Sequence, residues 1–571
     1  MKKNYLLLFL STLIIYATVA GQKRITEPCG ETISTVTIDQ IIKKLMDTAE
    51  VSGLGIGIIN DNKVAYVKSY GYKNKSENKF NDTATCFYAA SLAKPLFAYL
   101  VMQLVDEGVI DLDKPLYTYL SKPLPDYENY KDLAGDDRWK LITARECLDH
   151  TTGFPNWRQF NPRDNQKLEI FFTPGERYAY SGEGIYLLQF VVETITGKHL
   201  EDLAKDKVFK PLRMTRTSFL WQPQFETNYA VGHDISENPL PKDKRTESNA
   251  AGSMETTIAD YSNFVAAVMQ GKGLSQKSKQ EMLSPQIGIN TKRQFPSLSN
   301  DTTNENKKIQ LSYGLGWGFF TSPAGKAFFK EGHGDGWVHY MISFPGKKIA
   351  VIIMTNSANG ESIFKELVEK ITGVTIPWEW EGYTPYRATV KLSVKVLQQF
   401  TGNYDGKLRA TITLVKGRLR VESKKAGLPE TNLYAENDHR FFLKVMATDI
   451  EFVRGADGKV EKAILDDEGE HYELKKIDSH SEVPQTINTN SYVGTYALSS
   501  DPKRTIVIKK ENNFLVADLP GYPGLQLVFQ TDTEFQFAGL TDANGEFIIT
   551  NEKVIKIVIS QNGTFEWNKI K

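Results

Sequence analysis

Apolar residues follow two different patterns along this chain of 571 residues, and the change between them falls near residue 380. In the first part, two apolar runs flank Asp61-Asn62, which predicts a β-hairpin. Helical spacing and strand-like runs then alternate in blocks, which predicts an α+β domain whose helices cover an antiparallel sheet. We expect helices at 38–48, 91–107, 143–148, 184–195 and 258–269, and strands at 53–59, 64–67, 313–320, 338–344 and 350–354.

The second part contains short apolar runs separated by Gly, Asp and Asn turns. It also repeats, since Phe400-Thr401-Gly402-Asn403-Tyr404 is echoed by Tyr492-Val493-Gly494-Thr495-Tyr496. A spacing of about 90 residues is too long for a solenoid and suits two small all-β domains, each a barrel or a sandwich. Residues 377–385, with proline at both ends, are expected to be the exit linker of the first domain. The predicted domains are 21–380, 388–478 and 487–571.

The first twenty residues have the pattern of a signal peptide. Lys2 and Lys3 precede an apolar run from Tyr5 to Ile15, and small residues follow it. The run is shorter than the roughly 20 apolar residues of a membrane span, and no later apolar segment reaches that length. We therefore expect an exported protein, periplasmic or extracellular, with no membrane span after signal removal. An uncleaved anchor is the alternative.

Composition limits the partners and the cofactors. Lysine plus arginine and aspartate plus glutamate both total 69, and removing the first twenty residues leaves 67 basic against 69 acidic groups. With no basic surplus we expect no nucleic-acid partner, and a small-molecule or peptide substrate instead. The three cysteines, Cys29, Cys86 and Cys147, allow one disulfide at most and fit no metal motif. We expect neither a metal nor a cofactor.

Four Ser-x-x-Lys patterns occur, starting at Ser76, Ser91, Ser362 and Ser500, and their surroundings distinguish them. Only Ser91 follows an apolar run and opens a helix, which places Lys94 on the same helix face. A serine hydroxyl needs an adjacent base to act as a nucleophile, and a lysine amine becomes one when burial lowers its pKa. The start of a helix also offers N–H groups to a developing oxyanion.

The segment Phe87–Leu112 resembles the active-site segment of the serine β-lactamase-related family, which includes class C β-lactamases, DD-peptidases, D-aminopeptidases and esterases. Four further stretches resemble later family motifs in the family's order. They are Leu148-Asp149-His150-Thr151-Thr152-Gly153, Pro174–Gly182, Tyr313-Gly314-Leu315-Gly316-Trp317 and Gly332-His333-Gly334.

The resemblance implies a role for each matching residue. Ser91 would be the acylated nucleophile, Lys94 its base and Tyr180 a phenol that relays protons. His333 would contact the substrate, and the amides of Ser91 and Gly336 would form the oxyanion hole.

This chain departs from the family pattern in three ways. Gly182 stands where the family usually has asparagine, and no Lys-Thr-Gly triplet occurs, so a cation that grips a substrate carboxylate is missing. Asp335 and His339 replace common glycines. Asp335 could fix the tautomer of His333 or meet a substrate amine, and it could equally be a polar loop residue.

The sequence thus predicts an exported serine hydrolase that forms a Ser91 acyl-enzyme on amides or esters, with D-amino-acid peptides or small esters as substrates. Three other functions stay open. A true β-lactamase or DD-carboxypeptidase would use the same residues, and a non-catalytic protein on this fold would bind cell-wall fragments. A zinc site would use His333, Asp335 and His339, which share a face of an extended strand.

Overall fold

The computed structural model describes most of the chain after the expected signal segment, which lies outside the described residues. The described residues are 24–163, 165–383, 387, 389–415, 417–423, 428–444, 448–467, 470–477, 489–511, 514–519, 522–529, 533–537, 544–550, 553–560 and 564–570. They form two compact units: the described residues within 1–388 together with Lys444, and the described residues within 389–443 and 448–571. The domain boundaries given above stay predictions. No helix within the described part of the chain has the length and apolar character needed to cross a bilayer.

The first unit is built on a nine-stranded sheet in the order β5-β4-β3-β13-β12-β11-β10-β9-β8, with antiparallel neighbours throughout. The predicted hairpin is confirmed as β3–β4, and its turn residues Asp61 and Asn62 have φ of 51° and 58°, as a tight two-residue hairpin turn requires. The strands are β3 (Gly53–Asn60), β4 (Lys63–Asn74), β5 (Lys79–Phe80), β8 (Ile287–Gly288), β9 (Ser312–Tyr313), β10 (Gly318–Ser322), β11 (Gly325–Gly334), β12 (Trp337–Phe344) and β13 (Ile349–Thr355).

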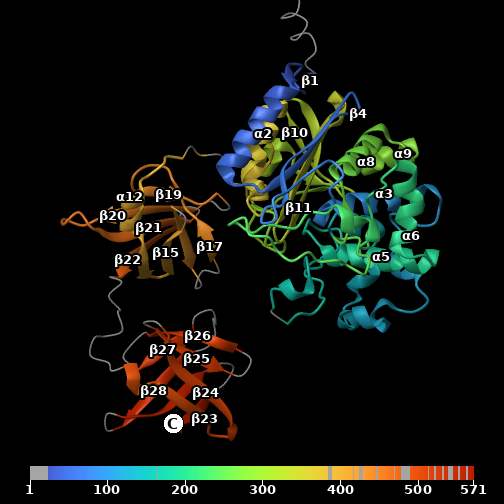
Figure 1. Ribbon diagram of the computed structural model, residues 1–571. Coiled ribbons are helices and arrows are strands. Elements are labelled where there is room, and N and C mark those ends of the chain that lie inside the picture. Colours follow the sequence, from blue (N-terminus) through green and yellow to red (C-terminus); the bar gives the residue numbers. More distant parts are fainter. Residues whose placement is uncertain are drawn as a thin grey trace, which may run out of the picture. The chain divides into compact units, whose positions relative to one another are not determined.

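Helices cover both faces of this sheet (Figure 1). Helices α2 (Thr35–Ala49) and α10 (Phe364–Thr372) share a core with Ile56 of β3, whereas α3 (Ala93–Asp106) and α8 (Ile258–Gln270) share the other core with Ile352 of β13. Gly57 allows α8 to lie close to the sheet, because a Cβ there would be 2.0 Å from Ser262 Oγ. The other helices include α4 (Ala144–Leu148), α5 (Gly182–Thr196), α6 (Leu200–Ala204) and α9 (Gln276–Met282).

Most of the predicted elements are confirmed within a few residues, with three exceptions. The expected strand 313–320 is divided into β9 and β10, and β11 was not foreseen. The exit linker at 377–385 is wrong for its described residues: α11 (Trp378–Glu381) forms there, and Trp380 and Tyr383 are buried in the first unit's core. Tryptophan and tyrosine bury large apolar areas, so they anchor this segment rather than letting it run free.

The second unit confirms all-β structure in both repeats. The first repeat forms an antiparallel sheet and the second forms a closed eight-stranded barrel, β23 to β30. In each repeat a buried tyrosine donates a hydrogen bond to the carbonyl four residues earlier, Tyr404 to Phe400 at 2.8 Å and Tyr496 to Tyr492 at 2.7 Å. The two matching sequence segments therefore make the same local structure.

Short helix α12 (Val394–Leu397) precedes the first of these sheets, whose order is β17-β16-β15-β14-β22-β21-β20-β19-β18. Its strands are β14 (Gly402–Gly406), β15 (Arg409–Val415), β16 (Arg418–Ser423), β17 (Leu428–Asn432), β18 (Tyr434–Ala435), β19 (Arg440–Phe442), β20 (Thr448–Arg454), β21 (Val460–Asp467) and β22 (Glu470–Ile477). The barrel strands are β23 (Gly494–Leu498), β24 (Asp501–Glu511), β25 (Phe514–Leu519), β26 (Tyr522–Phe529), β27 (Glu534–Phe537), β28 (Asn544–Thr550), β29 (Lys553–Ser560) and β30 (Thr564–Lys569).

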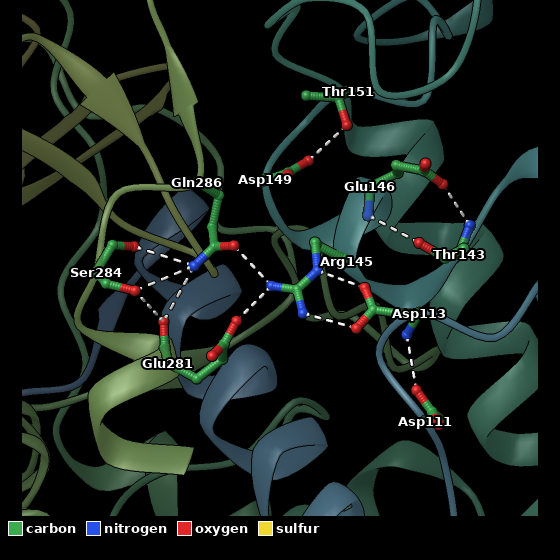
Figure 2. Close-up of polar contacts among 10 residues, drawn as sticks. All are labelled: Asp111, Asp113, Thr143, Arg145, Glu146, Asp149, Thr151, Glu281, Ser284 and Gln286. Carbon is green, nitrogen blue, oxygen red and sulfur yellow. Dashed lines mark hydrogen bonds and ion pairs between the residues drawn. The ribbon is translucent and has the colours of Figure 1, made fainter. Parts of the chain in front are cut away.

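A single arginine ties α4 to three other segments of the first unit. Figure 2 shows the Arg145 guanidinium between Asp113 on one side and Glu281 and Gln286 on the other. It donates two bonds to the Asp113 carboxylate, at 2.6 and 2.9 Å, and one each to Glu281 and Gln286 at 2.6 Å. Such a fork matches carboxylate geometry. It fixes the short helix that leads into His150.

We expect Arg145→Met to lower the stability of the first unit by about 1–3 kcal/mol, because Glu281 and Gln286 lose a charged donor. Thermal unfolding followed by tryptophan fluorescence measures this, since seven of the eight tryptophans precede residue 388. Lys131→Met is the matched control, because the Lys131–Glu128 pair is largely exposed. Equal melting temperatures for Arg145→Met and the control would contradict the anchoring role.

Candidate active site

Ser91 lies in a turn that the neighbouring backbone holds firmly. It is the middle residue of the 3₁₀ turn Ala90–Leu92, which leads directly into α3. The Ala89 amide donates to the Met254 carbonyl at 2.8 Å, and buried His339 Nε2 donates to the Tyr88 carbonyl at 2.7 Å. These contacts fix the backbone before Ser91.

The residue before Ser91 has an uncommon backbone conformation. Ala90 has φ of +47°, in the left-handed region that residues with a Cβ rarely adopt, and it is buried. Such strain is kept only where surrounding structure imposes it, and it concentrates at functional sites. Here it aims the Ser91 side chain, which is half-buried and lines a cavity.

Lys94 meets Ser91 as the sequence predicted. Its Nζ lies 2.9 Å from Ser91 Oγ and 2.7 Å from the Ala251 carbonyl. The side chain is fully buried, and this burial lowers the pKa of Lys94 even though Tyr180 opposes the shift. A lysine in this state can accept the Ser91 proton.

Tyr180 completes the cluster from the segment before α5. Its ring centroid is 5.0 Å from Lys94 Nζ and 4.8 Å from Nζ of Lys330 on β11. Burial by itself would raise the pKa of Tyr180, but Lys330 and then Lys94 lower it overall. The hydroxyl is buried and makes no well-aligned hydrogen bond with any described residue, although Ser91 is near enough to lower the pKa further. The phenol is therefore poised to exchange a proton.

Ser91 and Tyr180 border a cavity of about 330 Å³, whereas Lys94 is not among the residues that line it. Its walls include Ser91, Tyr180, Trp157, Arg245, Glu331 and His333. Asparagines 156 and 249 add amide groups to the lining. The cavity is at the small end of the range for ligand sites, and its lining is polar.

Gly182 shows why the family's asparagine is absent here. A Cβ at Gly182 would lie 2.2 Å from the Trp157 ring, so any side chain at this position would overlap the indole. The Gly182 amide N–H donates a hydrogen bond to the side-chain oxygen of Asn156 at 3.1 Å. The Trp157 ring thus occupies the space that a side chain at position 182 would need.

The residues predicted around the Gly332-His333-Gly334 segment are only partly brought together. His333 lines the cavity and its Nε2 lies 3.0 Å from Glu361 Oε2. Asp335 is exposed in the turn after β11, and it does not border the cavity. Gly336 follows in the left-handed region, with φ of +75°, and a Cβ there would meet the backbone of His233 at 2.7 Å. The roles of Asp335 and Gly336 stay predictions.

The grouping proposed for zinc does not form. Buried His339 uses Nε2 for the Tyr88 carbonyl, and its Nδ1 accepts from the Thr355 amide at 3.2 Å. Burial lowers the pKa of His339 to about 4, which keeps the ring neutral. Across the described residues, no three His, Cys, Asp or Glu side chains gather as metal ligands do. The three cysteines are unpaired.

Sequence reasoning missed several residues of the cavity, above all Arg245, Glu331 and Trp157. Arg245 stacks over Tyr88, with Cζ 4.0 Å from the ring centroid, and pairs with Asp243 at 3.1 Å. No local motif marks these positions, because they come from separate loops and from an unforeseen strand. Only the position of Glu331 two residues before His333 could have suggested it.

The buried carboxyl of Asp149, next to His150, should make the stability of the fold depend on pH. It accepts a hydrogen bond from Thr151 Oγ1 at 2.7 Å (Figure 2), and burial raises its pKa to about 7. A carboxyl whose pKa is higher in the folded than in the unfolded state gives stability at low pH that is lost as pH rises toward the folded pKa. Between pH 4 and pH 7 the wild type should therefore lose up to about 4 kcal/mol through this group.

We expect Asp149→Asn to keep the bond from Thr151 and to be more stable than the wild type at pH 8, with the difference vanishing near pH 4. Tryptophan-detected melting at several pH values tests this. Asp137→Asn is the control, since that side chain is 84% exposed and should show no such trend. A stability difference that stays constant with pH would refute the buried-carboxyl explanation.

Known proteins resemble this chain over most of its length. A family model described as Beta-lactamase matches residues 38–372. Penicillin-binding protein 4* of Bacillus subtilis (strain 168) is 24% identical over 453 residues, which cover 71% of this chain and 91% of that protein. The same organism's putative penicillin-binding protein PbpX is 26% identical over 276 residues, 46% of this chain and 66% of that protein.

Among solved structures, the octameric penicillin-binding protein homologue from Pyrococcus abyssi has a TM-score of 0.51 at 20% sequence identity. The match covers 78% of this chain and 100% of that one. At this level of identity the likeness concerns the fold.

Proposed function

Because this chain belongs to the Beta-lactamase family and carries that fold ahead of its all-β sheets, we propose that it is an exported serine hydrolase acting through an acyl-enzyme on Ser91. The penicillin-binding relatives support a serine hydrolase type of function. One observation carries the proposal: fully buried Lys94 holds its Nζ 2.9 Å from Ser91 Oγ. A nucleophile beside a base of lowered pKa is the arrangement that acyl transfer needs.

The mechanism follows from the three side chains. Ser91 Oγ attacks the substrate carbonyl carbon, and its proton passes to the Lys94–Tyr180 pair as the Oγ–C bond forms. The same proton then goes to the leaving amine or alcohol as the C–N or C–O bond breaks. Water attacks the acyl-enzyme in the second half, gives a proton to the pair, and Ser91 Oγ takes it back when the acid is released.

The cavity favours small, polar acyl groups. Its volume of about 330 Å³ is bordered by Arg245, Glu331, His333 and two asparagines, which offer both donors and acceptors. We infer amides of D-amino-acid peptides or small esters as substrates. β-Lactams rank lower, because the chain has no Lys-Thr-Gly triplet.

Export is part of the proposal and rests on the sequence of the first twenty residues. Lys2-Lys3, the apolar run and the small residues after it have the order of a secretory signal. Mass spectrometry of the mature protein from its host tests this, with a new N-terminus near residue 21 as the expected result.

An activity-based probe tests the chemistry. We expect a fluorophosphonate to label the native protein, with the adduct on the peptide that contains Ser91. A panel of D-amino-acid amides, D-Ala-D-Ala peptides, short-chain esters and a β-lactam then ranks the substrates. A folded native protein that takes no label and hydrolyses nothing would instead support the cell-wall-fragment binding protein.

A further inference from the structure

A second buried lysine faces the active-site phenol from the unforeseen strand. Lys330 lies on β11 with no exposed surface, three residues before His333. Its Nζ is 4.8 Å from the Tyr180 ring centroid, and Lys94 Nζ is 5.0 Å from the same centroid. Lys94 already bonds Ser91 and the Ala251 carbonyl. Lys330 has no such link to the nucleophile, so its place beside Tyr180 needs its own explanation.

A buried acidic partner holds Lys330 in this position. Lys330 Nζ donates to Glu331 Oε1 at 2.6 Å and to the Glu331 carbonyl at 3.0 Å. Gln294 Nε2 donates to the same Oε1 at 2.6 Å. All three residues are at most 3% exposed. A buried ion pair is often no more stabilising than apolar residues of the same size, so stability is a weak reason for keeping this one.

The pKa values of the two lysines shift in opposite directions. Burial opposes the ammonium form of both, but Glu331 and Tyr180 outweigh it at Lys330 and raise the pKa of that lysine, whereas burial prevails at Lys94. The other groups that face Tyr180 add no positive charge. His150 packs on its ring at 4.3 Å and stays neutral, because burial and the two lysines hold its pKa well below the usual range. Glu331 is the nearby negative group, and Tyr178 and Tyr313 are neutral.

We propose that Lys330 is a positioning residue for Tyr180: its ammonium, held in place by Glu331, stabilises negative charge on the Tyr180 oxygen. The proposal rests on the proposed acyl transfer at Ser91, where Tyr180 exchanges protons with Lys94, the leaving group and water. Lys94 and Lys330 would then have different roles in the reaction. Lys94 moves the proton, and Lys330 supplies a charge that stays fixed during the reaction.

The titration of Tyr180 tests this without any substrate. The full-length chain is made with 3-fluorotyrosine, and the Tyr180 signal in the ¹⁹F NMR spectrum is assigned by its loss in Tyr180→Phe. In the double variant Lys330→Met/Glu331→Gln both charges are removed together and Gln294 keeps an acceptor. We expect its Tyr180 midpoint to rise by at least about one pH unit, a tenfold change in the ionisation equilibrium. An unchanged midpoint in the folded variant would overturn the proposal.

A matched pair elsewhere controls for the loss of a buried ion pair. Lys242 and Glu255 lie 2.7 Å apart, are 5% and 3% exposed, and face tryptophan rings rather than Tyr180. Lys242→Met/Glu255→Gln should leave the Tyr180 midpoint where it is in the wild type. If the Lys330 double variant does not fold, Glu331→Gln alone serves. Its Tyr180 midpoint should fall, because the ammonium is no longer shared with a carboxylate, and a higher midpoint would overturn the proposal.

A kinetic readout separates this proposal from the proposed function. In the double variant Lys330→Met/Glu331→Gln, the acid limb of the pH profile for fluorophosphonate labelling should move to higher pH together with the Tyr180 midpoint. In Lys330→Arg, which keeps the positive charge, the acid limb should lie close to its wild-type position. A wild type that never labels would refute acyl transfer at Ser91 while the titration still decides what Lys330 does. If the wild type is labelled but the Tyr180 midpoint does not shift in the double variant, acyl transfer at Ser91 stands and the role proposed for Lys330 is refuted.

Discussion

Replacing Ser91 by alanine is expected to lower kcat/KM for every substrate that the protein hydrolyses by about 10⁴-fold or more, since removal of a catalytic serine costs up to about 10⁶-fold in a well-studied serine protease. The melting temperature should stay the same, because Ser91 is half-buried and loses a single hydroxyl. Fluorophosphonate labelling should disappear altogether. Steady-state kinetics on the best substrate of the panel, with labelling followed in parallel, measures both effects.

Ser362→Ala is the matched control for this change. Ser362 has the same spacing to a lysine, but Lys365 forms an ion pair with Glu369 on α10 at 2.8 Å, and neither Ser362 nor Lys365 borders the cavity. Its kcat/KM and labelling should equal those of the wild type. A Ser91→Ala protein that still turned over substrate at the normal rate would mean that another residue, or another site, performs the reaction.

The Ser91–Lys94 contact could be predicted because it is local. Both residues lie at the start of one helix, and a spacing of three places their side chains on one face whatever the rest of the chain does. The hairpin at Asp61-Asn62 was predictable for the same reason, since the turn residues and the flanking apolar runs are adjacent in sequence. Tyr180 was found through its resemblance to a family motif, and no helical or strand period marks it.

The strand β11 was missed for a physical reason. A central strand is recognised by a continuous apolar run, but Lys330, Glu331 and His333 interrupt this one, and glycines frame it. The charges are tolerated because Lys330 and Glu331 neutralise each other inside the protein. Sequence patterns record the polarity of single residues and not their pairing, so a buried ion pair looks like exposed surface. Lys330, one of the residues hidden in this way, has its Nζ 4.8 Å from the Tyr180 ring centroid.

The linker prediction failed through a related mistake. Proline at both ends of 377–385 suggested a free segment, whereas Trp380 and Tyr383 belong to the core shared by α2 and α10. Trp380 also donates to Thr291 Oγ1 at 3.2 Å, so its polar atom has a partner. Two aromatic side chains outweigh the turn-forming residues around them.

The three buried lysines differ in the partners that burial leaves to them. Lys330 and Lys242 each have a carboxylate within 2.7 Å. Lys94 has no carboxylate at ion-pair distance among the described residues, and it bonds a hydroxyl and a carbonyl instead. Burying an ammonium group without a counter-ion costs free energy, so such a lysine adds little to the stability of the fold. Its retention therefore points to chemistry more than to stability.

Loss of the Lys94 amine should have the second large effect. We expect Lys94→Met to lower kcat/KM by about 10³-fold, within the usual contribution of a general base, while the melting temperature stays within a few degrees of the wild type. Methionine fills most of the space of the lysine chain and removes a poorly compensated amine. The Ala251 carbonyl loses its donor, which costs about 1 kcal/mol and offsets part of that gain.

Lys242→Met provides the contrast that makes this result interpretable. It should destabilise the first unit by about 3–5 kcal/mol, because Glu255 is left as an unpaired buried carboxylate. Kinetics and tryptophan-detected melting on both variants therefore separate a catalytic lysine from a structural one. If Lys94→Met instead lost its fold and kept its activity per folded molecule, Lys94 would be a packing residue, and the base for Ser91 would have to be Tyr180 alone.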